Sequence, residues 1–213
     1  PWVRMKVAAS LDGRTALETG ESQWITGAAA REDGHRFRAR ACAVLTGIGT
    51  VKDDNPRLTV RDVATTRQPL RVVVDSRLET APSAHVAGTG TLIFAAAMDE
   101  ARAGPLRDQG CEIVVLPNAQ GKVELPDLLK ELARRGVNEV HVEAGYKLNG
   151  SLLHEGLVDE LLVYLAPSVL GGSAPGMFHL AELQSLDERH RLEFIETARV
   201  GADLRVRARV VKP

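Results

Sequence analysis

The sequence predicts an α/β fold with a mixed, mostly parallel β-sheet, helices on both faces and a C-terminal antiparallel hairpin. Three observations lead to this prediction. Short apolar runs alternate with segments of helical periodicity, the pattern of repeated β-α units. The runs are almost continuously apolar, as in strands covered on both faces. Residues 190–200 and 203–211 then alternate between apolar and polar side chains, and Gly201-Ala202 between them predicts a hairpin turn.

The first elements of the chain are a strand and a helix. Residues 2–10 alternate as a half-buried strand and end at the turn sequence Leu11-Asp12-Gly13. Thr26 is a suitable N-cap for a helix that runs to about residue 41. The apolar face of this helix carries Ala30, Gly34, Phe37 and Ala41, and a neighbouring stripe carries Arg31, His35 and Arg38. Arg38 therefore flanks the buried face and can reach a pocket.

The rest of the chain continues the alternation. Strands are predicted at 41–47, 70–75, 91–97, 111–116, 137–142 and 158–166, and helices at 99–108, 125–135 and 148–157. Residues 47–56 hold Gly47, Gly49 and Pro56, and we interpret them as a glycine-rich turn followed by acidic residues.

The composition narrows the class of function. The 213 residues suit one large domain, and a formal net charge of −1 argues against nucleic-acid or membrane partners. No apolar stretch reaches 18 residues, and the two cysteines suit buried free thiols of a reducing cytosol. The six histidines share no metal-ligand or catalytic-triad spacing, so no metal is expected. We expect a cytoplasmic protein that binds small molecules.

One stretch, residues 137–153, suggests a binding site. An apolar run ends in Glu143, and a glycine turn then leads into a helix, so unpaired backbone N–H groups and the helix dipole favour an anion there. Gly145 and Gly150 have P-loop spacing, but Ser151 stands where a P-loop requires lysine, and the stretch is not GxGxxG. From these residues alone, an anion site and an ordinary strand-to-helix connection both stay open.

Several stretches together resemble the reductase domain of the bifunctional riboflavin-biosynthesis deaminase-reductase. They are KVAASLDGRTA (6–16), GESQWIT (20–26), GIGTVKDDNPRLTVR (47–61), VVVDS (72–76), VEAGYKLNGSLL (142–153) and VDELLVYLAPSVLGG (158–172). The resemblance implies a dihydrofolate-reductase-like fold and a single reductase domain over residues 1–213. The deaminase half of that family combines H-x-E with P-C-x-x-C, and this combination does not occur in the chain, so no deaminase domain is expected in it.

The resemblance also implies a reaction. It is the NADPH-dependent reduction of 5-amino-6-(5-phosphoribosylamino)uracil to the ribitylamino product, in which the opened imine accepts hydride at C1′. Two alternatives remain open. The chain is either a related reductase for the diaminopyrimidinone phosphate or dihydrofolate, or an NADP-binding protein without reductase activity. A homodimer is expected from the apolar closing hairpin and from the resemblance.

The resemblance assigns roles residue by residue. The cofactor is expected against Ala8, Trp24, Thr50, Asp54, Ser76, Gly145, Tyr146, Lys147, Leu148, Asn149, Gly150 and Ser151. Our own addition is Arg77, as a partner of the cofactor 2′-phosphate. The substrate is expected against Ser22, Arg38, Leu58, Arg61 and Glu143. Asp54 is the first candidate for proton transfer or for stabilising an iminium, and Lys6 is the second. Lys147 departs from the family pattern, and it either contacts the pyrophosphate or points to solvent.

Overall fold

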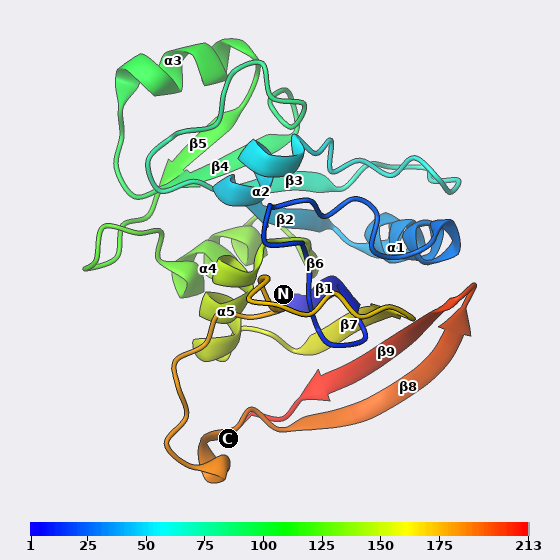
Figure 1. The fold of residues 1–213 in the computed structure, drawn as a ribbon. Helices are drawn as coiled ribbons and strands as arrows, with labels where there is room; N and C mark the ends of the chain where they lie inside the picture. The colour runs from blue at the N-terminus through cyan, green and yellow to red at the C-terminus, as the bar shows by residue number, and fades with distance from the viewer. Residues whose placement is uncertain (213) are drawn as a thin grey trace. The chain divides into compact units, whose positions relative to one another are not determined.

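The computed structural model describes residues 1–212 (Figure 1). The contacts within it divide the chain into two compact units. The first unit comprises residues 38–144 together with Pro1. The second comprises residues 2–37 and the chain from Gly145 onward. Each unit has its own part of the β-structure, and each is described separately below.

The first unit contains five parallel strands in the order β5-β4-β3-β2-β6. They are β2 (Ala43–Gly47), β3 (Leu70–Val74), β4 (Thr91–Ala95), β5 (Glu112–Val115) and β6 (Glu139–Val142), and the helices are α2 (Ile48–Asp54), α3 (Glu100–Asp108) and α4 (Leu125–Arg134). Every residue of β2 and β4 is buried, so both faces of this sheet are covered, as the continuous apolar runs predict.

The core of the first unit explains why these segments pack as they do. Val44, Val73 and Ile93 lie on successive strands and belong to one buried cluster. Val51 of α2 and Leu106 of α3 join the same cluster, so it holds both helices to the sheet. The carboxyl ends of the parallel strands therefore have fixed positions. In α/β proteins, the loops at these ends commonly carry the ligand contacts.

The second unit contains β1 (Trp2–Ser10), β7 (Glu160–Ala166), β9 (Asp203–Val210) and β8 (Leu192–Val200), in that order. β1 and β7 are parallel, whereas β9 is antiparallel to both β7 and β8. The helices are α5 (Tyr146–His154), the 3-10 turn η1 (Leu186–Glu188) and most of α1 (Ala28–Arg40), whose last three residues belong to the first unit.

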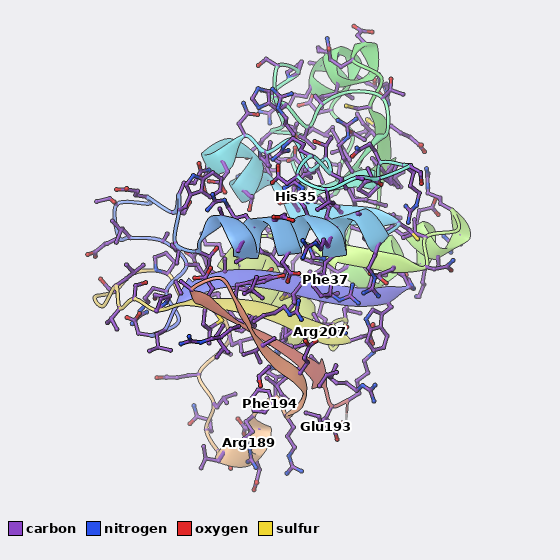
Figure 2. The ribbon with its side chains drawn as sticks, turned by 90° about the vertical axis from the view of Figure 1, so that its right-hand side faces the viewer. His35, Phe37, Arg189, Glu193, Phe194 and Arg207 are labelled. Carbon is purple, nitrogen blue, oxygen red and sulfur yellow. The ribbon has the colours of Figure 1, made fainter. Side chains whose placement is uncertain are left out.

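Aromatic and charged side chains stabilise the second unit around α1. The ring of Phe37 lies beneath the guanidinium of Arg4, at 5.1 Å, and near that of Arg207, at 5.7 Å (Figure 2). The buried carboxylate of Asp33 accepts hydrogen bonds from Tyr164 and Arg205, both at 2.7 Å. These contacts tie α1 to β7 and β9, and they give the buried charge of Asp33 an opposite charge and hydrogen-bond partners.

The structure confirms the predicted fold class, with each predicted strand present and the closing hairpin antiparallel. Two details of the prediction are wrong. Residues 48–54 form the helix α2 rather than a turn, because Val51 is buried in the core and Asn55, at φ 43°, ends the helix in the left-handed region. The helix α1 begins at Ala28, so Gly27 occupies the N-cap position in place of Thr26, and its carbonyl accepts the Arg31 N–H.

Two expectations from the composition can also be compared with residues 1–212. Both cysteines are free, but Cys42 is half-buried while Cys111 is buried. Among the described helices, none has the length and apolar character needed to cross a bilayer.

Candidate functional site

An ion pair in the first unit joins Arg38, in the last turn of α1, to Glu143, which follows β6. Arg38 Nε donates to Glu143 Oε1 at 2.7 Å, and Nη2 donates to Oε2 at 2.9 Å. The geometry is bidentate, the arrangement in which guanidinium and carboxylate bind most strongly. The side chains are 11% and 19% exposed, so the pair is largely removed from water but keeps an open side.

Neighbouring groups fix the pair in place. The Glu143 carbonyl accepts from the Thr46 hydroxyl at 2.7 Å, and the Glu143 N–H donates to the Leu45 carbonyl at 2.8 Å. The imidazole Nε2 of His141, which is fully buried, lies 3.4 Å from Glu143 Oε1. Arg38 Nη1 donates to the Thr59 carbonyl at 2.6 Å. The pair therefore connects the ends of α1, β2 and β6 with the loop at Thr59.

These contacts determine the charge of the site. Burial raises the pKa of Glu143, but the charge of Arg38 and the adjacent His141 imidazole outweigh it and hold that pKa well below its ordinary value. Burial lowers the pKa of Arg38, but the attraction of Glu143 outweighs it and raises that pKa. At neutral pH the site thus presents an ionised carboxylate, which acts only as a hydrogen-bond acceptor.

The loop at Thr59 carries two more of the residues predicted to contact substrate. Leu58 is buried and has φ 53°, in the left-handed region that non-glycine residues rarely adopt. Such strained residues persist where surrounding contacts fix them, and they are common at binding sites. Arg61 is exposed, and its Nη1 donates to the Thr59 hydroxyl at 3.2 Å. The structure therefore gathers Arg38, Leu58, Arg61 and Glu143 around Thr59.

The first unit also holds four residues predicted to contact the cofactor. Thr50 is half-buried in α2, and Asp54 is exposed at the end of that helix. After β3, the Ser76 hydroxyl accepts from the Val123 N–H at 3.2 Å. Arg77 is 74% exposed, and its Nε lies 3.0 Å from a carboxylate oxygen of Glu79.

In the second unit, the turn at Gly145 leads directly into α5. Gly145 is the N-cap residue, and no side chain caps the helix. The first N–H groups of a helix have no acceptor within it, and the helix dipole is positive at this end. Lys147 is exposed, with its ammonium 5.8 Å from the centre of the Tyr146 ring, and Leu148 is half-buried. The start of α5 therefore lies at the positive end of the helix dipole and has no side-chain cap.

The later residues of the same turn face different surroundings. Gly150 and Asn149 are buried, and Asn149 Nδ2 donates to the Met177 carbonyl at 3.4 Å. A Cβ on Gly150 would lie 2.0 Å from the His179 carbonyl oxygen, so close packing requires glycine here. Ser151 is exposed, and its hydroxyl donates to the Lys147 carbonyl at 3.2 Å.

The remaining predicted residues lie on β1 and in the loop that follows it. Lys6 and Ala8 are half-buried and share one face of the strand. Ser22 is half-buried, whereas Trp24 is 69% exposed. The Arg31 guanidinium lies over the Trp24 ring, 4.4 Å from its centre.

Sequence reasoning missed the residues that support the Arg38–Glu143 pair. These residues are Thr46, Thr59 and His141, and their contacts join segments that are distant in the chain. The local sequence indicates only one of them, through the triplet His141-Val142-Glu143. This triplet matches H-x-E by itself. However, Glu143 is paired with Arg38, and residues 1–212 contain no group of three His, Cys, Asp or Glu side chains placed to hold a metal.

Comparison with known proteins identifies first the fold class of the chain and then its family. Dihydrofolate reductase from Enterococcus faecalis, solved with NADP(H), superposes with a TM-score of 0.54 at 11% identity and covers 99% of this chain and 97% of its own. The fold is therefore dihydrofolate-reductase-like. The family model described as RibD C-terminal domain matches residues 1–206, and the chain belongs to this family.

Individual relatives agree with this assignment. The riboflavin biosynthesis protein RibD of Escherichia coli is 39% identical over 217 residues, which cover 96% of this chain and 58% of that protein. The structure of Acinetobacter baumannii RibD superposes with a TM-score of 0.88 at 34% identity, covering 100% of this chain and 58% of that one. The chain thus spans little more than half the length of the relatives that it matches.

Proposed function

We propose that this chain is an NADPH-dependent reductase of riboflavin biosynthesis that converts 5-amino-6-(5-phosphoribosylamino)uracil to the ribitylamino product. The observation that carries the proposal is the buried, bidentate Arg38–Glu143 pair at the end of β6. It provides an ionised acceptor for the N–H and amino groups of a pyrimidine. Membership of the RibD C-terminal domain family supports the same reaction.

We propose different roles for the two arginines near Thr59. Arg38 already donates from Nε, Nη1 and Nη2 to Glu143 and Thr59, so its main role is to hold Glu143 ionised and oriented. Arg61 is exposed on the same loop, and a guanidinium suits the ribose 5-phosphate. Leu58 and Ser22 complete the proposed substrate contacts.

The proposed cofactor contacts lie at the uncapped end of α5 in the second unit and in the segment after β3 in the first. The N–H groups that follow Gly145 suit the pyrophosphate, and the exposed Lys147 adds a positive charge beside them. Ser76 and Arg77 suit the 2′-phosphate of NADPH, and the small Ala8 allows a close approach of the backbone. NADPH supplies the hydride when it is bound.

The protein's own chemical contribution is to orient the reactants and to handle one proton. Asp54 is exposed at the end of α2, where a carboxylate can stabilise an iminium charge or transfer a proton. Lys6 is the second candidate for this role. Neither role requires a covalent intermediate or a metal ion.

We also propose a homodimer in the cytoplasm. β8 pairs only with β9 in the second unit, and its exposed side chains include Phe194, at 76% exposure. An apolar edge strand of this kind is typical of a surface that another chain covers.

An assay with purified protein tests the proposed reaction. NADPH oxidation is measured with the phosphoribosylamino-uracil, with the not yet deaminated diaminopyrimidinone phosphate and with dihydrofolate. We expect turnover with the uracil compound and little with dihydrofolate. Turnover of dihydrofolate together with failure on both phosphoribosylamines would contradict the proposal, and NADPH binding without any oxidation would identify a binding protein.

A further inference from the structure

The ten-residue segment from Leu170 to His179 follows β7 in the chain, and we call it the strap. It contacts two separate parts of the second unit. One part is the segment Asp12–Glu18, which leads to Ser22 and Trp24. The other is α5, which carries the proposed pyrophosphate site. The strap is not one of the elements for which the sequence suggested a role.

The first half of the strap is bound to Asp12–Glu18 by a series of polar contacts. The Asp12 carboxylate accepts from the N–H groups of Leu170, at 3.1 Å, and Gly171, at 2.8 Å. Together with the Ser10 hydroxyl, these donors lower the pKa of Asp12 to about 2, so the contact is present at neutral pH. Further along, Arg14 Nη1 donates to the Ala174 carbonyl at 2.8 Å.

Backbone contacts extend this attachment. The Thr15 N–H donates to the Pro175 carbonyl at 2.9 Å, and Arg14 forms an antiparallel bridge with Gly176. Residues 12–15 and 170–176 are therefore bound along their length rather than at one point. A displacement of one segment must displace the other.

The second half of the strap packs against α5 with no intervening side chain. The His179 N–H donates to the Tyr146 carbonyl at 2.9 Å, and the two rings meet edge to face with centroids 6.0 Å apart. The backbone of His179 occupies the space that a Cβ on Gly150 would need. Met177 contacts both parts. Its carbonyl accepts from Asn149 of α5, and its Cε lies 3.5 Å from the position of a Cβ on Gly13, in the segment after β1.

We propose that the strap positions the first turn of α5 relative to the loop that carries Ser22 and Trp24, with Arg14 and Gly150 as its positioning residues. Neither residue needs to touch a ligand for this role. Breaking the strap on the Arg14 side loosens its hold on Tyr146, so the N–H groups at the start of α5 lose their fixed direction. This inference rests on the proposed function, because it assumes that α5 binds the cofactor.

The first test is Arg14→Ala, with the dissociation constant of NADPH measured by calorimetry and the kinetic constants measured by NADPH oxidation. We expect the dissociation constant to rise by about two- to thirtyfold, the range in which contacts within a network affect a distant site. We expect kcat to change less than KM for NADPH. The control is Arg189→Ala, which also removes a guanidinium bound to a backbone carbonyl in the second unit but lies outside the strap. Equal NADPH affinity in Arg14→Ala and wild type would overturn the proposal.

The second test is Gly150→Ala, which displaces His179 from the opposite side. Its control is Gly104→Ala in α3, where a Cβ meets nothing within 4 Å. Hydrogen exchange then compares the amides of residues 146–149 in all four variants and the wild type. We expect faster exchange at these amides in Arg14→Ala, even if Gly150→Ala does not fold. Unchanged exchange there in Arg14→Ala would overturn the proposal.

The wild type separates this inference from the proposed function. If the wild-type protein neither binds nor oxidises NADPH, the proposed function fails. If it does both, while Arg14→Ala matches it in NADPH affinity and amide exchange, only the role of the strap fails.

Discussion

At the scale of single residues, the Arg38–Glu143 pair affects both the charge of the proposed site and the stability of the protein. Both side chains are mostly removed from water, so each charge depends on the other for its stabilisation. Replacing Glu143 with glutamine keeps the shape and leaves the Arg38 charge without its counter-ion. We expect Glu143→Gln to lower the free energy of unfolding by about 3 kcal/mol, measured with urea. Glu32→Gln is the control, because its partner Arg36 is exposed and a surface pair contributes about 0 to 1 kcal/mol.

The same pair predicts a dependence of stability on pH. The pKa of Glu143 is depressed in the folded state, so its stabilisation is present above the unfolded-state pKa of about 4.3 and is lost as pH falls toward the folded-state pKa. Urea unfolding between neutral pH and about pH 3 should show a shallower acid dependence in Glu143→Gln than in wild type. Parallel curves for the two proteins would refute this assignment of the charge.

Asp54 is the residue whose role depends most on chemistry rather than on packing. It is exposed, so Asp54→Asn should fold normally and bind NADPH with nearly unchanged affinity. We expect kcat to fall by roughly 10²- to 10⁴-fold, the usual contribution of a group that transfers a proton. The control is Asp53→Asn, an exposed neighbour on the same helix. A loss of NADPH binding in Asp54→Asn would mean that this carboxylate belongs to the cofactor site alone.

At the scale of elements, α2 and α3 differ in how clearly their ends are encoded. The helix α3 begins after Asp99, whose carboxylate accepts from the N–H groups of Ala101, at 3.1 Å, and Arg102, at 3.3 Å. The helix α2 has no such cap and lies between glycines and a proline, so the local sequence predicts a turn there rather than a helix. Burial of Val51 against the sheet, which no local pattern shows, stabilises it.

The cap of α3 gives a prediction at this scale. Asp99→Ala should lower the free energy of unfolding by about 1 kcal/mol, because two N–H groups lose their acceptor and the helix dipole loses a nearby negative charge. Asp108→Ala at the opposite end of the helix is the control, and it should be neutral or slightly stabilising. Urea denaturation of both variants measures the difference, and equal losses would contradict the capping role.

At the scale of the whole molecule, the closing hairpin is the surface that we propose forms the dimer. Leu192, Phe194 and Ile195 on β8 are 44%, 76% and 44% exposed, and Figure 2 shows Phe194 on this hairpin. We expect sedimentation to show a dimer for the wild type and a monomer for Phe194→Lys. Leu186→Lys, which changes an exposed apolar residue in η1, should remain dimeric. A wild type that is monomeric at micromolar concentration would exclude this interface.

The sequence by itself determined the order and type of nearly all the strands and helices. Apolar runs and turn residues are local signals, and they survive into the structure wherever burial agrees with them, as in β4 and α4. The ordered motifs likewise identified the family. The exposure of single residues is harder to predict from sequence. Cys42 lies beside an apolar strand and is predicted to be buried, yet it is only half-buried.

Only the tertiary structure decided how the candidate site is held together. Arg38 and Glu143 are 105 residues apart in the chain, and their pairing depends on where α1 and β6 end. Gly150 was predicted from its place in a glycine turn, yet the structure explains it by the backbone of His179, which a Cβ would strike. Such contacts join distant segments, and their geometry follows from packing of the whole core rather than from any local pattern. The sequence thus predicts the candidate site residues, whereas the tertiary fold determines which of them are in contact.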